Sequence, residues 1–584
     1  MVSSSRDNRE IASILEEIAL YQELSEENPF KVRAFEQAAR NIEALEENLG
    51  LAAEGGRLTE IKGIGKGIAE VIHDILDKGF SPLLEELKAT FPQGLKELLE
   101  IPGMGTKKTR AVWKKLGVSS VGELEYACRE NRLLTLEGFG QKSQQKILKG
   151  IEFRKQHSGQ HLVSEVLGIA EDVLRLLEGT GLFERIDIAG SLRRGKGTFK
   201  DIDILLVPHP DTEREAIREG LLALADSSQE ADGIIGAGDT KVSIRRGGLQ
   251  IDFRIVHEQS YPAALQHFTG SREHNTLLRG RAKGMGLKMN EYGVFRAEEA
   301  LPLRSEEDVY HSIDLPWIPP EIREADGEIE AAQEGKLPRL VEESDFRGMI
   351  HVHSNYSDGL STIEELALEC KKRGYSYLCL SDHSRSAFYA RGLTVERLKA
   401  QWEEVEGLNE KLSPFRIFRG IESDILSDGS LDYPEEVLTQ FDFVIGSIHS
   451  KLGMDREDAT ERLIRAVRNP YLTILGHPSG RLLLSREGYP FDEARLYEAL
   501  AEEGVVLEHN CNPYRLDPGW ESLKRAKRMS VPVSINPDAH RIDGFDDMRY
   551  GVIMARKAWL GTEDLLNCRG AEEIDEFFRK RKKR

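Results

Sequence analysis

The chain contains the stretch Gly190-Ser-Leu-Arg-Arg-Gly-Lys-Gly-Thr-Phe-Lys-Asp-Ile-Asp-Ile-Leu-Leu-Val207, in which two carboxylates directly precede an apolar run. Such a run predicts a buried strand, along which residues two apart point to the same side. Asp201 and Asp203 should therefore project together from the edge of a core, where unpaired charge is costly. A divalent cation is the usual compensation, and oxygen ligands suit magnesium or manganese.

Groups that bind phosphate precede these carboxylates. Gly190 and Ser191 supply backbone N–H groups and a hydroxyl, and Arg194 supplies a guanidinium fork. A cation site beside a phosphate cradle is typical of phosphoryl or nucleotidyl transfer. A third acid, Asp252, lies in a predicted strand at 249–256. Alone it would indicate an ordinary ion pair, but beside the other two it is a candidate third ligand.

The composition narrows the class of protein. The chain has 584 residues, of which 40% are hydrophobic. Its formal net charge is -20. This negative charge argues against a surface covered with basic residues that bind nucleic acid, but it allows a local basic groove. The five cysteines form no CxxC pair, which disfavours a disulfide framework or a cysteine-rich zinc site. No signal core or membrane-length apolar run is present. We therefore expect a soluble, cytoplasmic protein without membrane contact, and separately we expect a monomer.

A short motif, apolar-x-Gly-apolar-Gly, occurs three times in the helical region that ends near residue 155, beginning at Ile61, Ile101 and Leu136. Glycines let the backbone approach a phosphate closely, and the next helix offers its N-terminal amides. The motif thus predicts a helix-hairpin-helix that holds DNA without reading its sequence. One copy could simply cap a helix, but three favour nucleic-acid binding. The predicted DNA-binding residues are Gly63, Gly65, Gly103, Gly105, Lys107, Gly138 and Gly140.

The pattern becomes mixed α/β between about 160 and 318, with strands predicted at 185–189, 202–207, 241–245 and 249–256. Further on, His267-Phe-Thr-Gly-Ser271 is followed by Asn275 and Arg279, which are four apart and share a helical face. Residues 319–345 are rich in Glu, Pro and Gly and predict a solvated linker. The terminal basic run, 579–584, predicts a frayed tail.

Beyond the linker, apolar strands alternate with helical patterns, which indicates a parallel sheet or barrel. Nearly every strand ends in His, Asp or Glu, at the face where α/β barrels place catalytic groups. Six of the 15 histidines stand at such ends, so chance is a poor explanation. The mixed imidazole and carboxylate set suits zinc, manganese or iron, and several metals together suit phosphoester hydrolysis.

These residues resemble two known families. The Gly-Ser-x-x-Arg-Gly to Asp-x-Asp segment is similar to that of family X DNA polymerases such as DNA polymerase beta, and the strand-end set resembles a PHP (polymerase and histidinol phosphatase) domain. The whole chain resembles the bacterial PolX family. The resemblance implies a multidomain fold of α-helical helix-hairpin-helix regions, an α/β nucleotidyltransferase palm with thumb, and a distorted (β/α)7 barrel. The domains expected are a helix-hairpin-helix domain (1–85), a helical DNA-binding subdomain (86–155), the palm (156–258), a nucleotide-selection subdomain (259–318), the linker (319–345) and the PHP domain (346–584).

The resemblance also implies roles for individual residues. The catalytic metal-binding triad falls on Asp201, Asp203 and Asp252, with Mg²⁺ or Mn²⁺ as cofactor. The nucleotide-binding residues are Gly190, Ser191, Arg194, Phe268, Gly270, Ser271, Asn275 and Arg279. The PHP ligands, for up to three Mn²⁺, Zn²⁺ or iron ions, are His351, His353, Asp358, His383, Glu422, His449, His477, Asp538 and His540.

The implied activity is DNA-templated synthesis that fills short gaps in DNA repair, with gapped or nicked DNA and dNTPs as partners. The PHP domain implies a manganese-dependent 3′→5′ exonuclease, with abasic-site endonuclease or 3′-phosphatase activity as further family activities. The alternatives from the residues are a tRNA-tailing or antibiotic-modifying nucleotidyltransferase, a small-molecule phosphatase of the histidinol-phosphate type, and a non-enzymatic scaffold that binds DNA ends.

Two positions depart from the family pattern. Lyases of the family carry a Schiff-base lysine shortly after the first hairpin, where this chain has Val71. Since a lyase needs an amine nucleophile, we expect weak or no deoxyribose-phosphate lyase activity; Lys62 or Lys66 could substitute only with altered geometry. His267 stands where beta-type enzymes have tyrosine, which leaves the choice between ribose and deoxyribose open.

Overall fold

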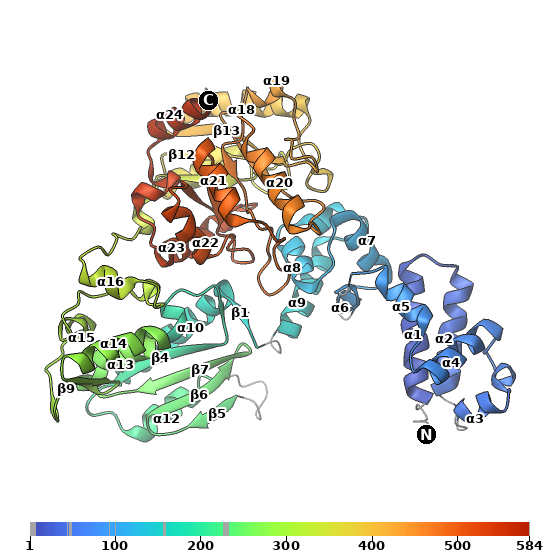
Figure 1. The fold of residues 1–584 in the computed structure, drawn as a ribbon, viewed down its shortest axis with the longest axis horizontal. Coiled ribbons are helices and arrows are strands. Elements are labelled where there is room, and N and C mark those ends of the chain that lie inside the picture. The colour runs from blue at the N-terminus through green and yellow to red at the C-terminus, as the bar shows by residue number, and fades with distance from the viewer. Residues whose placement is uncertain are drawn as a thin grey trace. The chain divides into compact units, whose positions relative to one another are not determined.

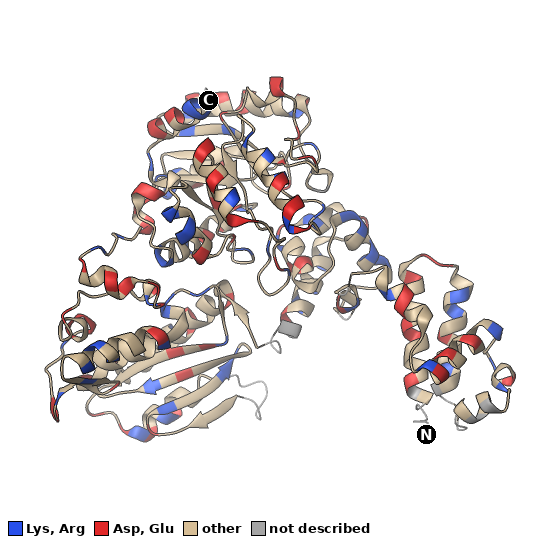
Figure 2. Ribbon diagram, in the orientation of Figure 1, with Lys and Arg blue, Asp and Glu red and all other residues tan. Residues whose placement is uncertain are grey.

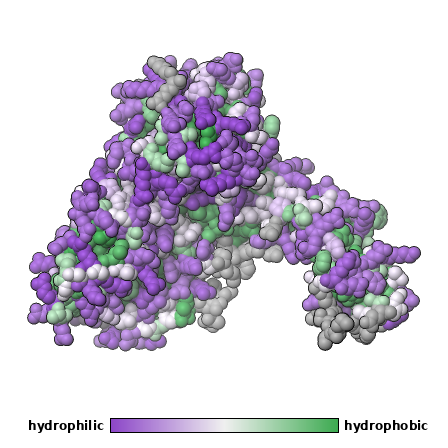
Figure 3. Space-filling view, viewed as in Figure 1, coloured by the Kyte–Doolittle hydropathy of each residue, from purple (hydrophilic) through white to green (hydrophobic). Residues whose placement is uncertain are grey.

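The computed structural model describes residues 8–582 except 44, 46–48, 93, 100, 156–158 and 226–232. The chain divides into two compact units, Met1–Ile151 and Glu152–Arg584 (Figure 1). Across the described residues, no helix combines the length and apolar character needed to cross a membrane. The face drawn in Figure 3 is mostly hydrophilic, with smaller apolar areas among the hydrophilic residues.

The first unit is helical, as predicted, and its apolar side chains form one core. Its helices are α1 (Asn8–Leu24), α2 (Pro29–Glu43), α3 (Leu49–Glu54), η1 (Leu58–Glu60), α4 (Lys66–Lys78), α5 (Pro82–Ala89), α6 (Leu95–Leu99), α7 (Thr106–Leu116), α8 (Val121–Arg129), η2 (Arg132–Thr135) and α9 (Gln141–Lys155).

The three predicted hairpins share one backbone geometry. Gly63, Gly103 and Gly138 all have positive φ, at 88°, 100° and 85°, a conformation that favours glycine. In each copy the second glycine of the motif directly precedes a helix, respectively α4, α7 and α9. Helix α7 carries basic side chains and no acidic one, as Figure 2 shows. The repeated turn therefore presents helix N-termini in the way that the motif predicted, and its contact with DNA stays a prediction.

The region expected to be the palm, called the palm below, is a five-stranded mixed sheet in the order β2-β4-β7-β6-β5, in which only β4 and β7 run parallel. Its strands are β2 (Phe183–Ile188), β4 (Asp201–Pro208), β5 (Ile234–Ala237), β6 (Lys241–Arg246) and β7 (Leu249–Ile255), with the small pair β1 (His161–Leu162) and β3 (Thr198–Phe199) beside it. Its helices are α10 (Val163–Thr180), α11 (Gly190–Arg193) and α12 (Arg214–Leu222). Strand β5 was missed in the sequence, because it is short and its residues are exposed.

The two faces of β4 explain where the carboxylates point. Ile202, Ile204 and Leu206 pack with α10 and α12, whereas Leu205 and Val207 pack with helix α13 (Tyr261–Thr269). Since side chains alternate along a strand, Asp201 and Asp203 share the face that α13 covers. The apolar run after them thus holds the strand in place while the two acids lie on the side of α13.

The region expected to be the nucleotide-selection subdomain, called the thumb below, begins with α13 and has its own small core. Its other elements are α14 (Arg272–Gly284), β8 (Leu287–Asn290), β9 (Gly293–Arg296), β10 (Glu299–Ala300) and α15 (Glu306–His311), and β8, β9 and β10 form an antiparallel sheet.

The C-terminal domain is a parallel seven-stranded sheet in sequential order from β11 to β17, nearly closed by pairing of Val352 with Ala539. Its strands are β11 (Gly348–Val352), β12 (Tyr377–Leu380), β13 (Arg416–Asp424), β14 (Phe443–Ser447), β15 (Ile474–Leu475), β16 (Val506–Asn510) and β17 (Val533–Asn536). Its helices are α17 (Ile363–Lys372), η6 (Phe388–Ala390), α18 (Val395–Leu412), α19 (Glu435–Leu438), α20 (Arg456–Val467), α21 (Glu493–Glu503), α22 (Trp520–Arg528), η7 (Ile542–Asp547), α23 (Met548–Lys557), η8 (Thr562–Asp564), η9 (Leu566–Cys568) and α24 (Ala571–Lys582). The predicted fold class, including the (β/α)7 barrel, is confirmed.

The basic C-terminal run was predicted as a frayed tail, and that prediction is wrong up to Lys582; residues 583–584 lie outside the described part. Helix α24 places Phe578 inside the barrel core, against Phe418 and Phe443. Arg581 is also buried, and its guanidinium donates to the carbonyl of Leu472 at 3.0 Å. The helix therefore closes the barrel end opposite the strand-end histidines.

The segment 319–345 was predicted as a solvated linker, and the structure corrects this. It forms η4 (Pro320–Ile322), α16 (Glu328–Gln333) and η5 (Glu343–Asp345), and Arg323 and Glu328 are fully buried. Arg323 donates to Glu306 at 2.6 Å, and Glu328 accepts from His274. Composition suggested solvent exposure, but long-range ion pairs hold these charged residues inside the fold.

We predict that Phe578→Ala lowers the free energy of unfolding of the barrel by about 3–5 kcal/mol, because a buried phenylalanine leaves a cavity. Urea unfolding followed by circular dichroism measures the change. Phe577→Ala is the matched control, since that side chain is only partly buried. Equal destabilisation by the two substitutions would contradict the inference that Phe578 of α24 closes the barrel end.

Two candidate active sites

The first candidate site is a cavity of about 410 Å³ between palm and thumb. Its lining is polar and carries charge of both signs. The lining residues are Gly190, Ser191, Arg194, Asp201, Asp203, Arg254, His267, Phe268, Gly270, Arg272, Asn275 and Arg279. Nine of the predicted catalytic and nucleotide-binding residues are among them, and its volume lies in the range of small-molecule sites.

The two strands that carry the acids fix their spacing. In the parallel pairing of β4 with β7, Asp203 lies opposite Asp252. Burial, followed by the negative charges of Asp201 and Asp252, raises the pKa of Asp203 to about 6. Three acids at the edge of an apolar sheet thus carry more negative charge than the surrounding protein neutralises. This excess fits the binding of a divalent cation.

Asp252 differs from the other two acids because the protein itself neutralises it. Its carboxylate accepts from Ser243 at 2.6 Å and Gln250 at 3.0 Å, and lies 2.7 Å from the ammonium of Lys241. Burial acts to raise its pKa, but these partners outweigh burial and the pKa lies below its ordinary value. Asp252 does not line the cavity, so the structure brings two carboxylates to the cavity wall and the third directly behind them.

The predicted phosphate cradle follows β2. Gly190 has a φ of 61°, and a Cβ there would lie 2.2 Å from Oδ2 of Asp203, so only glycine fits between cradle and acid. Arg194, nearly buried, donates through Nη1 to the carbonyl of Thr269 and through Nε to Glu324 at 3.2 Å. The guanidinium is thereby held at the cavity wall, where it can meet an anion.

The thumb residues are positioned by the break between α13 and α14. Gly270 lines the cavity, and the Ser271 hydroxyl caps α14 by accepting from the amide of His274 at 3.2 Å rather than lining the cavity. Both polar groups of the Asn275 side chain are hydrogen-bonded: its oxygen accepts from Gln266 and its NH2 group donates to the His267 carbonyl, each at 2.7 Å. The Asn275 side chain therefore serves the thumb's own structure in this state, while Arg279 remains exposed at the cavity rim.

Two cavity residues were missed in the sequence, Arg254 and Arg272. Arg254 lies on β7 two positions after Asp252 and stacks its guanidinium 4.8 Å from the Phe268 ring centre. The pattern Asp252-x-Arg254 in a predicted strand could have indicated Arg254 as a site residue, since it places both side chains on one face. The arginines add positive charge where a polyanion would bind.

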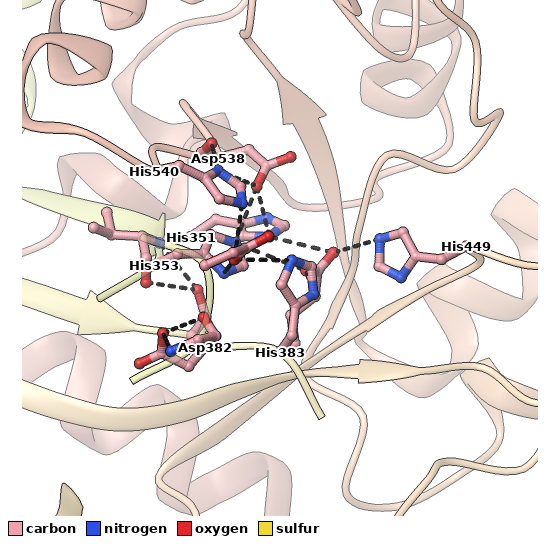
Figure 4. A network of polar contacts seen from close by, with 12 residues as sticks. His351, His353, Asp382, His383, His449, Asp538 and His540 are labelled. Carbon is pink, nitrogen blue, oxygen red and sulfur yellow. Dashed lines mark hydrogen bonds and ion pairs between the residues drawn. The ribbon is translucent and has the colours of Figure 1, made fainter. Parts of the chain in front are cut away.

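The second candidate site lies at the carboxyl ends of the barrel strands, where all nine predicted metal ligands converge. Figure 4 shows His351, His353, His383, His449, Asp538 and His540 pointing toward one another. Eight of the nine form groups whose ligand atoms lie within 4.8 Å of each other: His353, Asp358, His383 and His540; His351, His353, Glu422 and Asp538; and His383, Glu422 and His449. The ninth, His477, lies 3.0 Å from Glu422.

Several buried polar atoms in this cluster have no hydrogen-bond partner. They include both carboxylate oxygens of Asp358, Oε2 of Glu422, Nε2 of His351 and Nδ1 of His477. Such atoms are rare in native proteins, because each costs desolvation free energy. Their grouping in one buried cluster and their N and O chemistry fit divalent metal ions.

Backbone conformation and charge also distinguish the cluster. His351 and Asp538 have positive φ, at 64° and 54°, which is uncommon outside glycine and costs free energy. Glu422 is buried, which acts to raise its pKa, but the surrounding imidazoles of His449, His351 and His383 hold the pKa well below its ordinary value. The carboxylate therefore stays ionised, as a metal ligand must.

Two buried acids, Glu508 and Asp424, orient imidazoles of the cluster. Glu508 accepts from Nδ1 of His351 at 2.5 Å, from the amide of His477 and from Asn536. Asp424 accepts from Nδ1 of His449 at 2.6 Å. Each contact turns Nε2 of the histidine toward the centre, as partners of metal-bound histidines do. These acids were not predicted, although an acid inside the apolar strand 505–510 was a visible signal.

Four segments of the chain match known domain families. Residues 6–80 match a helix-hairpin-helix domain, and residues 95–152 match a SAM-like helix-hairpin-helix tandem. Residues 264–324 match the DNA polymerase beta thumb, and residues 350–510 match the PHP domain. The matches follow the order along the chain of the hairpins, the cavity and the histidine cluster.

Similar proteins cover either the whole chain or its last part. The chain is 39% identical over 578 residues to "DNA polymerase/3'-5' exonuclease PolX" of Bacillus subtilis (strain 168), which spans 98% of this chain and 99% of that protein. The C-terminal part is 31% identical over 248 residues to a protein named "Probable phosphatase" from Thermoanaerobacter sp. (strain X514), covering 40% of this chain and 95% of that protein. Nearly complete coverage in both directions, with the hairpins, cavity and histidine cluster in the same order, shows that the chain belongs to the PolX family of family X DNA polymerases with a C-terminal PHP domain.

Proposed function

We propose that the chain is a DNA-templated DNA polymerase that fills short gaps during repair, with a 3′→5′ exonuclease in its barrel. The observation that carries the proposal is that one chain has two separate clusters of acids suited to divalent cations, together with three hairpins of one geometry. The full-length relative, named as a polymerase and exonuclease, supports the same pair of activities.

In the polymerase site each residue acts through its charge or its size. Asp201 and Asp203, with Asp252 behind them, would hold Mg²⁺ or Mn²⁺, which supplies Lewis acidity for nucleotidyl transfer. Ser191 and Arg194 would bind the triphosphate, and Arg254 and Arg272 would add positive charge to the cavity. Gly190 lets the phosphate chain approach the acids, and Phe268 and Gly270 would lie against the incoming sugar. Asn275 and Arg279 would face the DNA minor groove.

In the barrel, the nine ligands would hold up to three manganese, zinc or iron ions, which supply Lewis acidity for phosphodiester hydrolysis. Glu508 and Asp424 would keep His351 and His449 in the ligating tautomer. The hairpin glycines and Lys107 would hold the backbone of gapped or nicked DNA.

A second activity of the barrel, removal of a terminal phosphate, is favoured by the 31% identity to the protein named "Probable phosphatase". The same ligand set can hydrolyse a phosphomonoester or a phosphodiester, since both need metal ions and an accessible phosphate. A primer that ends in a 3′-phosphate distinguishes the two activities, because only a phosphatase converts it to an extendable end.

We predict that Asp201→Ala/Asp203→Ala lowers primer extension at least roughly 100-fold, because several kcal/mol of transition-state stabilisation are lost, while primer degradation persists. His351→Ala/His353→Ala should have the opposite effect. A gapped primer with manganese, and a 3′-phosphate primer in parallel, measures both. Loss of both activities in either variant would contradict separate sites.

Asp203 and Asp252 should respond oppositely to removal of charge in the absence of metal. Ionised Asp203 costs folding free energy above pH 6, because its folded pKa lies above 3.8, so Asp203→Asn should stabilise the protein at pH 8 by up to about 3 kcal/mol and lose this effect below pH 4. Asp252→Asn should destabilise at pH 8, because the folded pKa of Asp252 is depressed and its contribution is lost as pH falls. Unfolding in EDTA measures both signs, and equal signs would refute the charge balance described.

We further propose that deoxyribose-phosphate lyase activity is weak or absent, since Val71 supplies no amine where the family's lyases place a lysine. The expected result is little or no covalent DNA adduct when borohydride is added to a 5′-deoxyribose-phosphate substrate. Trapping at the level of a beta-type lyase would overturn the proposal, and loss of that trapping in Lys62→Ala or Lys66→Ala would identify the nucleophile.

A further inference from the structure

A helix of the barrel domain reaches the wall of the polymerase cavity. Helix α23 follows the ligands Asp538 and His540 through η7, and its last residue, Lys557, is 1% exposed. The palm core itself includes Tyr550 and Met554 of α23. The helix therefore belongs structurally to both catalytic domains.

The ammonium of Lys557 has three acceptors. It donates to the carbonyl of Arg194 at 3.1 Å, to the carbonyl of Glu321 at 3.2 Å and to Oε1 of Glu324 at 2.5 Å. An ammonium has three N–H groups, so its donor capacity is filled. The indole of Trp520 lies beneath it, 5.1 Å from ring centre to nitrogen. A lysine buried this completely, with such contacts, holds a fixed position.

Glu324 joins this lysine to the triphosphate arginine. Its Oε1 also accepts from Nε of Arg194 at 3.2 Å. Burial acts to raise the pKa of Glu324, but the charge of Lys557 outweighs burial and the pKa lies below its ordinary value. One carboxylate thus lies between two cations, and the group of three keeps a net positive charge at the cavity wall.

Close packing against the barrel domain also holds the turn that follows Arg194. A Cβ on Gly195 would lie 2.3 Å from Cγ2 of Ile553, so the turn after the phosphate cradle packs directly on α23. A Cβ on Gly197 would lie 3.2 Å from Leu516 of the barrel domain. Arg556 adds an ion pair with Glu321, at 2.6 Å. The cradle is therefore supported from the nuclease side by packing as well as by charge.

We propose that Lys557, although it belongs to the nuclease domain, is a positioning residue of the polymerase site: by neutralising Glu324 it keeps the positive charge of Arg194 available to the triphosphate. Without this lysine, Glu324 and Arg194 would form a neutral buried pair, and the cavity would lose attraction for a polyanion. The inference rests on the proposed polymerase function and adds a dependence of nucleotide binding on the barrel.

The test uses the full chain and four proteins: wild type, Lys557→Met, Glu324→Gln/Lys557→Met and Lys527→Met. Methionine keeps the apolar stem and removes the charge. Lys527, on α22, is the matched control, because it also donates to a carbonyl and a carboxylate, those of Trp559 and Asp564, but within the barrel. The measurements are KM and kcat for dNTP on a gapped primer and the rate of degradation of the same primer with manganese.

Lys557→Met should raise KM for dNTP about tenfold or more, as expected for loss of a charge-assisted interaction, with kcat and degradation within about twofold of wild type. The double variant should recover most of the KM, because no unbalanced carboxylate remains, and Lys527→Met should match wild type. An unchanged KM in Lys557→Met overturns the inference. A joint loss of both activities that the double variant does not restore also overturns it. Absence of extension by wild type would instead refute the proposed function.

Discussion

Carboxylates held at the ends of apolar strands are the constraint on which both sites depend. Asp203 lies near the start of β4, whose following residues are buried, and Glu422 lies near the end of β13. Because the strands are fixed by their ladders and by the core, these acids cannot withdraw into water. Their charge must be met locally, by imidazoles, by Lys241 or by bound cations. Both candidate metal centres are therefore consequences of the same conflict between apolar burial and negative charge.

The apolar core of the palm extends into the barrel domain, since Leu516, Tyr550 and Met554 pack with palm residues. The segment 319–345, buried through Arg323 and Glu328, joins thumb and barrel as part of this body. Packed interfaces of this kind resist gradual deformation. The cavity and the histidine cluster therefore lie within one compact unit of the chain, Glu152–Arg584.

Local sequence patterns predicted those features whose structure depends on residues close together in the chain. The hairpin glycines and the Asp201-x-Asp203 pair belong to short motifs, and the structure gives the first glycine of each hairpin positive φ and places both acids at the cavity wall. The nine barrel ligands came from the family resemblance, and eight of them lie in close groups. Residues that act through distant partners were missed: Glu508 meets His351 across the barrel, and Arg254 meets Phe268 across the cavity. Composition misled at 319–345 and at α24, because charged residues there are paired with groups far away in sequence.

The sequence by itself determined the order of the domains, the chemistry of both acid sites and the residue types that serve them, because strand periodicity and glycine turns are local properties. Only the tertiary structure decided which acids face the cavity, that Lys241 neutralises Asp252, and that Lys557 of the barrel supports Arg194 of the palm. These relations depend on the pairing of strands and the packing of domains. Hydrophobic burial sets that packing over the whole chain, and no short stretch of sequence contains it.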